Sequence, residues 1–355
     1  MKAEKLPSGN WRVRVYMGKN KDGKNVYKSF TDPDKKRCMR IAVEFLESKR
    51  DAVSKATLGD LIESFITVQK TALSPATIRG YASIQSALKA NYRRLYSEDA
   101  YKITRDDLQQ LVNSLAEGHT PKTISNYLGL ISSAMSYNGI SCPVPNKPKR
   151  IKKDEYFPDD KDIQKIASSA NGSLKIAVYL AAYGCMRRSE ICALIWPTDF
   201  VGPNHLTASV TKAKVLGLDG NWIVKAPKTK NSRRKVALPP FVVEEIKRQC
   251  EPRRKDNNDE PVPVIPITPT GITEDFVKLL KRIGMPQFRF HLLRAYSASV
   301  SLGLGVPLPI VEARGGWEHG SQVLQRVYTH VLESQYSEGN DKINKHFEEM
   351  SRFAL

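Results

Sequence analysis

Apolar and polar residues alternate near the N-terminus with the two-residue period of a β-strand. Over residues 10–18 two sets of side chains alternate: Trp11, Val13, Val15 and Met17 in one set, Arg12, Arg14 and Tyr16 in the other. A turn-like stretch at 19–25 and a second short strand at 26–30 follow. Residues 34–50 then have a helical period, with Met39, Val43 and Leu46 on one side. This pattern predicts a small module of β-sheet plus helix within residues 1–54.

Residues 55–141 have the apolar period of several helices and contain one internal echo. The segments SPATIRGY (74–81) and TPKTISNY (120–127) share Ser or Thr, Pro, Thr-Ile and Tyr at equal spacing. Ser74 and Thr120 can each cap the start of a helix, and the prolines that follow fit its first turn. Two copies cannot build a solenoid, so we expect one all-α domain with two similar helix starts.

The pattern changes again after this region. Residues 142–157 are rich in proline and lysine, which predicts an extended basic linker. From 158 to 355 helical and strand periods mix: helices at 159–170 and 173–183, strands near 206–213, 221–226 and 234–238, then helices to the end. The predicted fold class is therefore multidomain α+β, with a sheet-plus-helix module, an all-α domain and a mixed α/β domain.

The charge balance narrows the class of partner. The 355 residues include 56 Lys and Arg against 37 Asp and Glu, a formal net charge of +19. Such an excess favours a polyanion, and nucleic acid is the commonest one. Candidate DNA contacts are basic residues of the N-terminal strands and of the linker: Arg12, Arg14, Lys28, Lys149, Arg150, Lys152 and Lys153. No basic amphipathic helix is evident, so a membrane partner is not expected.

The sequence also bears on location and cofactors. The densest apolar run, residues 176–183, is too short to cross a bilayer, and the first ten residues lack the apolar core of a signal peptide. The five cysteines are odd in number and form no CxxC pair, which argues against a disulfide framework or a zinc site. We expect a cytoplasmic protein with no metal and no cofactor.

Four segments carry candidate chemistry: GCMRRSEICALIW (184–196), KAPKTKNSRRKVALP (225–239), HLLR (291–294) and QRVYTHV (325–331), the last preceded by GGWEHG (315–320). In the first, Arg187 and Glu190 stand one turn apart at the start of an apolar helix, and Glu190 is expected to pair with a basic neighbour. The second predicts a strand, a turn at 230–232 and a returning strand, with Lys228 near the turn. In the third, His291 and Arg294 share one helical face, and the leucines between them turn towards a core.

These segments resemble the motifs of the tyrosine recombinases, the phage-type integrase family. CMRRSE is similar to the family's first motif, GLRxSE, and HLLR to its second, HxLR. KTKNSRR (228–234) resembles the turn that holds the family's lysine, and RVYTHV (326–331) the segment of its nucleophilic tyrosine. The resemblance covers nearly the whole chain. It implies an arm-type DNA-binding domain at 1–54, a core-binding domain at 55–141, and a catalytic domain with a C-terminal tail helix at 158–355.

The resemblance implies that DNA is cut and rejoined through a 3′-phosphotyrosine, without metal or ATP. The implied catalytic set is Arg187, Lys228, His291, Arg294, Trp317 or His319, and Tyr328. The two arginines would hold the phosphate oxygens and Lys228 would protonate the leaving 5′-oxygen. His291 would assist proton transfer at the nucleophile, Tyr328. The last phosphate ligand stays open: the nine-residue interval to Tyr328 favours His319, whereas the GGW sequence aligns Trp317.

Two stretches depart from the family's usual pattern: Cys185 in place of glycine, and Ala295-Tyr296-Ser297 after the second arginine. As partners the resemblance implies double-stranded DNA attachment sites, a homotetramer on two duplexes held by the tail at 332–355, and accessory DNA-bending or excision factors of a phage or conjugative transposon. Two alternatives remain. One is a type IB topoisomerase, which forms the same kind of phosphotyrosine bond. The other is a non-catalytic DNA-binding regulator on this scaffold.

Overall fold

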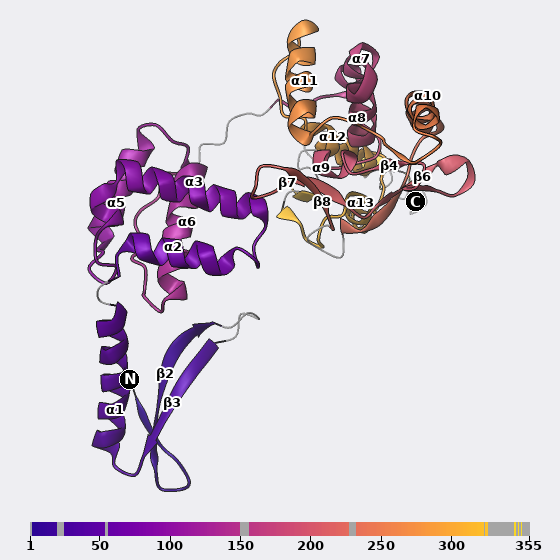
Figure 1. Ribbon diagram of the computed structural model, residues 1–355. Coiled ribbons are helices and arrows are strands. Elements are labelled where there is room, and N and C mark those ends of the chain that lie inside the picture. The colour runs from indigo at the N-terminus through magenta and orange to yellow at the C-terminus, as the bar shows by residue number, and fades with distance from the viewer. Residues whose placement is uncertain are drawn as a thin grey trace. The chain divides into compact units, whose positions relative to one another are not determined.

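The computed structural model describes residues 2–19, 25–53, 56–149, 156–226, 232–322 and 324–325, together with residues 344, 345, 347 and 349. The chain forms two compact units, Met1–Lys153 and Asp154–Leu355, whose elements are labelled in Figure 1. Each unit has hydrophobic clusters of its own.

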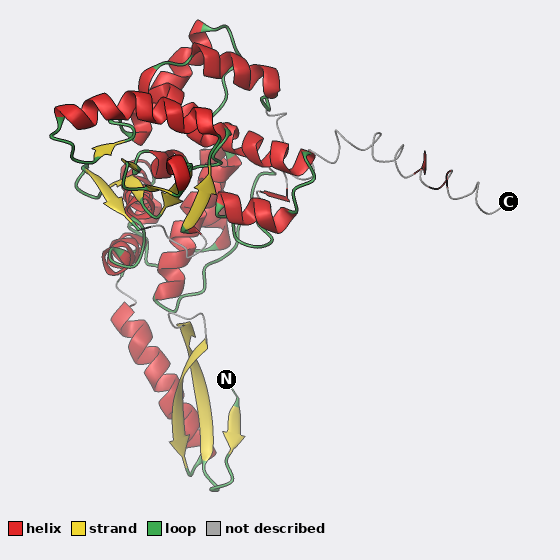
Figure 2. Ribbon diagram, turned by 90° about the vertical axis from the view of Figure 1, so that its right-hand side faces the viewer, coloured by secondary structure: helices red, strands yellow, loops and turns green. Residues whose placement is uncertain are grey.

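The first unit begins with a three-stranded antiparallel sheet beside one helix (Figure 2). Its elements are β1 (Ala3–Lys5), β2 (Trp11–Lys19), β3 (Asn25–Asp32) and α1 (Lys35–Val53), with the strands in the order β1-β2-β3. The alternation predicted on β2 is confirmed, because Val13 and Val15 are buried against Cys38 and Ala42 of α1. Strand β1 was not predicted. Val43, expected on the packed side of the helix, is instead exposed.

We expected Lys28 to share a face of the sheet with the arginines of β2. It lies instead on the face that packs on α1. It pairs across the strands with the buried Val15, and directly opposed side chains point to the same side. Its ammonium nitrogen is 4.0 Å from the ring centre of Phe45 on α1, a cation–π contact. The opposite face carries Arg14 with Tyr16 and Tyr27, whose exposed rings meet edge to face at 5.6 Å.

The rest of the first unit is helical, as predicted. Its helices are α2 (Leu58–Gln69), α3 (Pro75–Asn91), α4 (Arg93–Tyr96), α5 (Arg105–Ala116) and α6 (Pro121–Tyr137). Both expected helix starts are confirmed: the Ser74 side chain accepts a hydrogen bond from the backbone of Thr77, and Thr120 does the same for Thr123. One hydrophobic cluster holds the helices together, with Leu58, Ile62, Leu88, Leu108 and Ile131 among its buried members.

The helices of the second unit surround one apolar helix. They are α7 (Asp160–Ser169), α8 (Gly172–Ala182), α9 (Arg188–Ile191), α10 (Pro240–Asp256), α11 (Pro269–Arg282), α12 (Leu292–Gly303) and α13 (Leu308–Gly315). Helix α8 packs on α7, α9, α10, α11 and α12, which explains why it is apolar nearly all round. The start of α9 and the start of α12 are therefore held against the same rigid support.

The strands of this unit are short: β4 (Ile195–Trp196), β5 (Phe200–Val201), β6 (Thr207–Val210), β7 (Ala213–Leu216), β8 (Trp222–Lys225), β9 (Arg234–Ala237) and β10 (Val262–Pro263). The predicted hairpin over 225–239 is wrong. Strand β8 pairs with β7, and β9 pairs with β6 in the sheet β5-β6-β9, so the predicted single strand at 206–213 is two strands. The turn at 218–220 joins β7 to β8, and its Asp-Gly pair is a typical signal of a hairpin turn. Val210 and Val236 are buried, which fixes β9 on β6.

Candidate functional site

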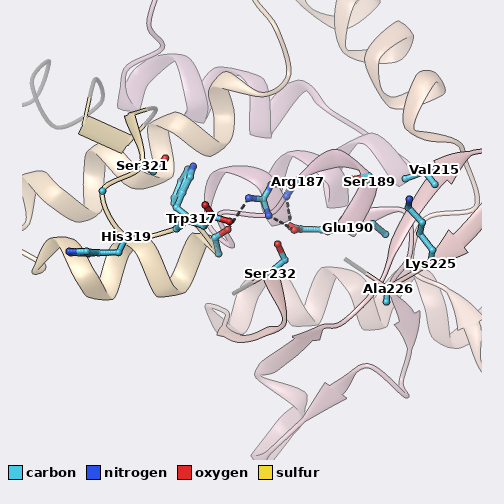
Figure 3. A pocket seen from close by; sticks show the side chains of 14 residues that line it. Arg187, Ser189, Glu190, Val215, Lys225, Ala226, Ser232, Trp317, His319 and Ser321 are labelled. Carbon is cyan, nitrogen blue, oxygen red and sulfur yellow. Dashed lines mark hydrogen bonds and ion pairs between the residues drawn. The ribbon is translucent and has the colours of Figure 1, made fainter. Parts of the chain in front are cut away.

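Arg187 stands at the turn that starts α9. Its backbone N–H donates to Glu190 Oε2 at 2.8 Å. Its guanidinium donates to Glu190 Oε1 at 2.7 Å, as Figure 3 shows, and to the Gly316 carbonyl at 2.9 Å. The two guanidinium bonds hold the side chain in place while 33% of it stays exposed. Arg187 is thus fixed at one edge and open at the other.

Glu190 is a buried carboxylate shared by two arginines, since Arg234 of β9 also donates to its oxygens at 3.1 and 2.8 Å. Burial alone would raise the pKa of Glu190. The hydrogen bond and charge of Arg234, followed by the backbone hydrogen bond and charge of Arg187, outweigh it and lower that pKa. The predicted pairing of Glu190 with a basic neighbour is confirmed, and the carboxylate is ionised at neutral pH.

The main chain at Cys185 binds two guanidinium groups. Its φ of +53° places a non-glycine residue in the left-handed region, at the position where glycine was expected. Its carbonyl accepts from Arg294 Nη1 at 2.7 Å and from Arg234 Nη2 at 3.5 Å. One backbone oxygen therefore ties α12 and β9 to the segment that leads into α9.

Arg294 is the most constrained side chain of the site, with 1% of it exposed. Its Nε and Nη2 have no hydrogen-bond partner among the described residues and are closed to solvent. Its guanidinium carbon lies 3.9 Å from the ring centre of Trp317, in a stacked cation–π contact. Burial, with the positive charges of Arg187 and Arg234, lowers the pKa of Arg294 to about 9, which still leaves it charged at neutral pH. Each unmade hydrogen bond costs about 1–3 kcal/mol, which an anion bound there would restore.

The loop after α13 holds Trp317 against Arg294. A Cβ on Gly315 would lie 2.0 Å from the Trp317 ring, so only glycine leaves room for the indole. Gly316 follows with a φ of +65°. The buried Glu312 closes the loop, because one carboxylate oxygen accepts from Gly320 N–H at 3.0 Å and the other lies 3.0 Å from His319 Nδ1.

His319 faces Glu312 at the rim of the site. Its side chain is 90% exposed. Figure 3 shows the imidazole directed away from Arg187, with Trp317 on the nearer side. Sequence spacing favoured His319 as a phosphate ligand, whereas the structure brings Trp317 into contact with an arginine of the site.

His291 immediately precedes α12, three residues before Arg294, as predicted. The leucines between them behave as expected: Leu293 is fully buried and Leu292 packs against the same core. His291 is exposed to solvent. Partial desolvation by the surrounding protein, and then the charges of Arg294, Arg187, Arg289 and Arg188, lower the pKa of His291. The neutral imidazole that predominates at neutral pH can accept a proton.

Several of the remaining predicted site residues cannot be placed in the site. Lys228, Tyr328, Arg150, Lys152, Lys153 and most of the tail at 332–355 lie outside the described residues. Tyr296, which belongs to the stretch that departs from the family's pattern, donates its hydroxyl to Asp160 at 2.7 Å. Burial and this carboxylate raise the pKa of its phenol, which disfavours a phenolate there.

Two pockets adjoin at Arg187, whose side chain belongs to the lining of both. The first, of about 550 Å³, is also lined by Glu190, Lys225, Ser232 and Trp317 (Figure 3). The second, of about 480 Å³, lies between the start of α9, helix α11 and the segment before α12. Arg187 can therefore act on groups bound on either side of it.

Sequence reasoning missed two residues that build this site, Arg234 and Glu312. Arg234 sits in the basic run SRRK, where nothing distinguishes the one arginine that reaches a buried carboxylate from its exposed neighbours. Glu312 did have a signal: it is an acidic residue within the apolar face of a helix, and a buried carboxylate needs a partner.

Two kinds of feature are absent from the described residues. No helix there is long and apolar enough to span a membrane. No group of three His, Cys, Asp or Glu side chains within the same ranges is arranged to hold a metal ion.

Known proteins resemble this chain in sequence. The profile of the phage integrase family matches residues 158–335. A protein of Caldanaerobacter subterraneus subsp. tengcongensis named tyrosine recombinase XerC-like is 27% identical over 378 residues, which cover 95% of this chain and 96% of its own. The integrase of Mycobacterium phage L5 is 30% identical over 166 residues, 45% of this chain and 44% of its own.

Solved structures share the fold at low sequence identity. The Tn1549 transposon integrase in complex with transposon right end DNA has a TM-score of 0.65 at 16% identity, covering 81% of this chain and 99% of that one. A lambda integrase tetramer bound to a Holliday junction has a TM-score of 0.54 at 14% identity, covering 91% and 93%. Because the family profile spans half of the sequence, the chain belongs to the phage integrase family of tyrosine-type site-specific DNA recombinases.

Proposed function

We propose that this recombinase integrates or excises a mobile DNA element by cutting and rejoining DNA through a 3′-phosphotyrosine at Tyr328. The observation that carries the proposal is Arg294, a buried, charged guanidinium with two donors that have no partner among the described residues. Such a group suits a bound phosphate. Both donors are closed to solvent, so the groups around them must move before a phosphate can reach them. The names of similar proteins, integrases of phages and of a transposon, support the mobile-element role.

The chemistry assigns each step to a group of the chain. The Tyr328 oxygen attacks the phosphorus as its proton passes to the neutral imidazole of His291. The bond from phosphorus to the 5′-oxygen breaks, and Lys228 supplies the proton that this oxygen takes. Arg187 and Arg294 hold the non-bridging oxygens, on which negative charge grows in the transition state. The phosphotyrosine conserves the energy of the broken bond, so rejoining reverses the same steps.

Trp317 is our candidate for the remaining phosphate ligand, in place of His319. Its ring stacks on Arg294 and lies in the same pocket as Arg187. An indole N–H can donate one hydrogen bond to a phosphate oxygen. His319 is assigned a positioning role instead, since its contact with Glu312 helps to close the loop that carries Trp317.

DNA binding is assigned to several parts of the chain. Residues 1–54 would bind arm-type sites through the exposed face of the sheet, with Arg14 beside Tyr16 and Tyr27. Residues 55–141 would bind the core site, and the basic linker that includes Lys149 would lie along the backbone. The chain would assemble as a homotetramer on two duplexes through its C-terminal tail. The lambda integrase tetramer bound to a Holliday junction supports this assignment.

The first test uses a suicide duplex, nicked near the cleavage point of a site selected for tight binding. The native chain should form a covalent adduct, and Tyr328→Phe should form none while binding within about twofold of the native affinity, because only the nucleophilic oxygen is lost. An adduct with Tyr328→Phe on a denaturing gel contradicts the assignment.

The same substrate separates the alternatives. A non-catalytic regulator forms no adduct with the native chain, whereas a topoisomerase forms one but does not exchange strands between two duplexes. A recombinase is expected to exchange strands between the two duplexes. Its complexes should contain four chains, as measured by mass photometry.

Arg294→Lys should lower the cleavage rate by about 10²–10³-fold while changing DNA affinity only a few-fold. Lysine keeps the charge but loses the planar pair of donors that the transition state needs. Single-turnover cleavage and equilibrium binding are compared with those of Arg248→Ala, an exposed arginine on α10. Equal losses of rate and affinity for Arg294→Lys would mark it as an ordinary backbone contact.

Trp317→Ala and His319→Ala decide the last phosphate ligand. We expect the tryptophan change to slow cleavage by about 10²-fold and the histidine change by less than about tenfold, since only Trp317 touches Arg294. The reverse order of effects in single-turnover assays would restore His319 as the ligand.

Arg14→Ala should weaken binding to distal arm-type sites by about tenfold and leave core-site cleavage unchanged. Lys28→Ala is the matched control, because Lys28 lies on the face that packs on α1. Footprinting on a complete attachment site reads out both variants. An Arg14→Ala footprint identical to that of the native chain would remove the arm-binding role from this face.

A further inference from the structure

The second pocket beside Arg187 has the chemistry of an anion site. Its polar lining includes Arg187, Arg188, Ser189, Arg289 and His291, and none of the described residues in its wall is a carboxylate. The first pocket differs, because its lining includes Glu190 and Glu318. The described lining of the second pocket is therefore basic, and it attracts a polyanion.

Arg188 is the cation best placed to bind there. It is exposed and has no carboxylate partner within the described part of the chain. It does donate to the hydroxyl of Thr273, a contact between α9 and the first turns of α11. This contact orients the guanidinium and leaves other N–H groups available to a ligand.

The apolar wall of the pocket is rigid. The Phe276 ring meets Phe288 and Phe290 edge to face, at 5.4 and 5.3 Å between ring centres. All three are buried in the main core. A wall of this kind can pack against the deoxyribose that joins two phosphates, while the cations take the phosphate oxygens.

The lowered pKa of His291 reports the same field. Two of the charges that lower it belong to Arg188 and Arg289, in addition to the effects of burial and of Arg294 and Arg187. The arginines of the second pocket are thus close enough to affect the group that is assigned to take the tyrosine proton.

We propose that this pocket is a second phosphate subsite, which holds the phosphodiester next to the scissile one on the same DNA strand. Successive phosphates of one strand are only about 3.4 Å apart along the helix axis, so adjoining pockets that share Arg187 suit consecutive phosphates. The inference rests on the proposed function. It adds Arg188, with Arg289, as positioning residues that set the register of the strand in the active site.

The test is a chemical double-mutant cycle on DNA binding. A series of duplexes is made, each with a single neutral methylphosphonate, placed at a different position around the cleavage point. The protein carries Tyr328→Phe so that no covalent bond forms. At the position adjacent to the scissile phosphate, the neutral linkage should weaken binding by about tenfold. Arg188→Ala should cause a similar loss on unmodified DNA and no further loss on that one duplex. The salt dependence of binding should also become shallower by about one phosphate.

Arg282→Ala is the control, because Arg282 lies at the far end of α11 and is bonded to the Ser169 carbonyl. Its effect should add to the methylphosphonate effect at every position. The subsite is refuted if, at every position, the loss of DNA affinity from Arg188→Ala adds to the loss from the methylphosphonate, and the loss from Arg289→Ala does so too. Binding is read without cleavage, so this outcome is distinct from a failure to form the phosphotyrosine.

Discussion

The candidate site depends on a buried carboxylate that lets several positive groups lie together. Burial, and then the charges of Arg187 and Arg234, disfavour the charged form of Arg294. Glu190 pairs with Arg187 and Arg234 through hydrogen bonds of 2.7 to 3.1 Å. Arg294 has no such partner and is held by a carbonyl and an aromatic ring instead. The site thus combines two arginines that are paired with Glu190 and a third, Arg294, with two donors that have no partner among the described residues.

The connections of this cluster explain why short, separate motifs make one site. Glu190 and Arg187 come from the turn at α9, Arg234 from β9, and the Gly316 carbonyl from the loop after α13. Helix α8 supports both α9 and α12 from beneath. Removing one partner of the buried pair of Glu190 and Arg234 would leave a buried charge without its partner, which is far more destabilising than losing an exposed ion pair.

Sequence patterns predicted the local features well and the long-range partners poorly. The caps at Ser74 and Thr120, the buried Leu293 and the pairing of Glu190 follow from rules that act within one or two turns. The partner of strand β9 could not be read in this way, because the choice between β6 and β8 depends on which valines reach the core. Nor could spacing show that Trp317, rather than His319, reaches the arginine, since Gly315 and Glu312 set the course of that loop.

The left-handed turn at Cys185 has a consequence for how the family can diverge. The acceptor that holds Arg294 and Arg234 is a backbone oxygen, so it is present whatever side chain occupies the position. Selection on that oxygen constrains the path of the chain and not the identity of the residue. A substitution at 185 that tolerates a φ near +53° can therefore drift without changing the chemistry. The core accommodates the sulfur of Cys185, which is buried and donates to the Arg294 carbonyl at 3.7 Å.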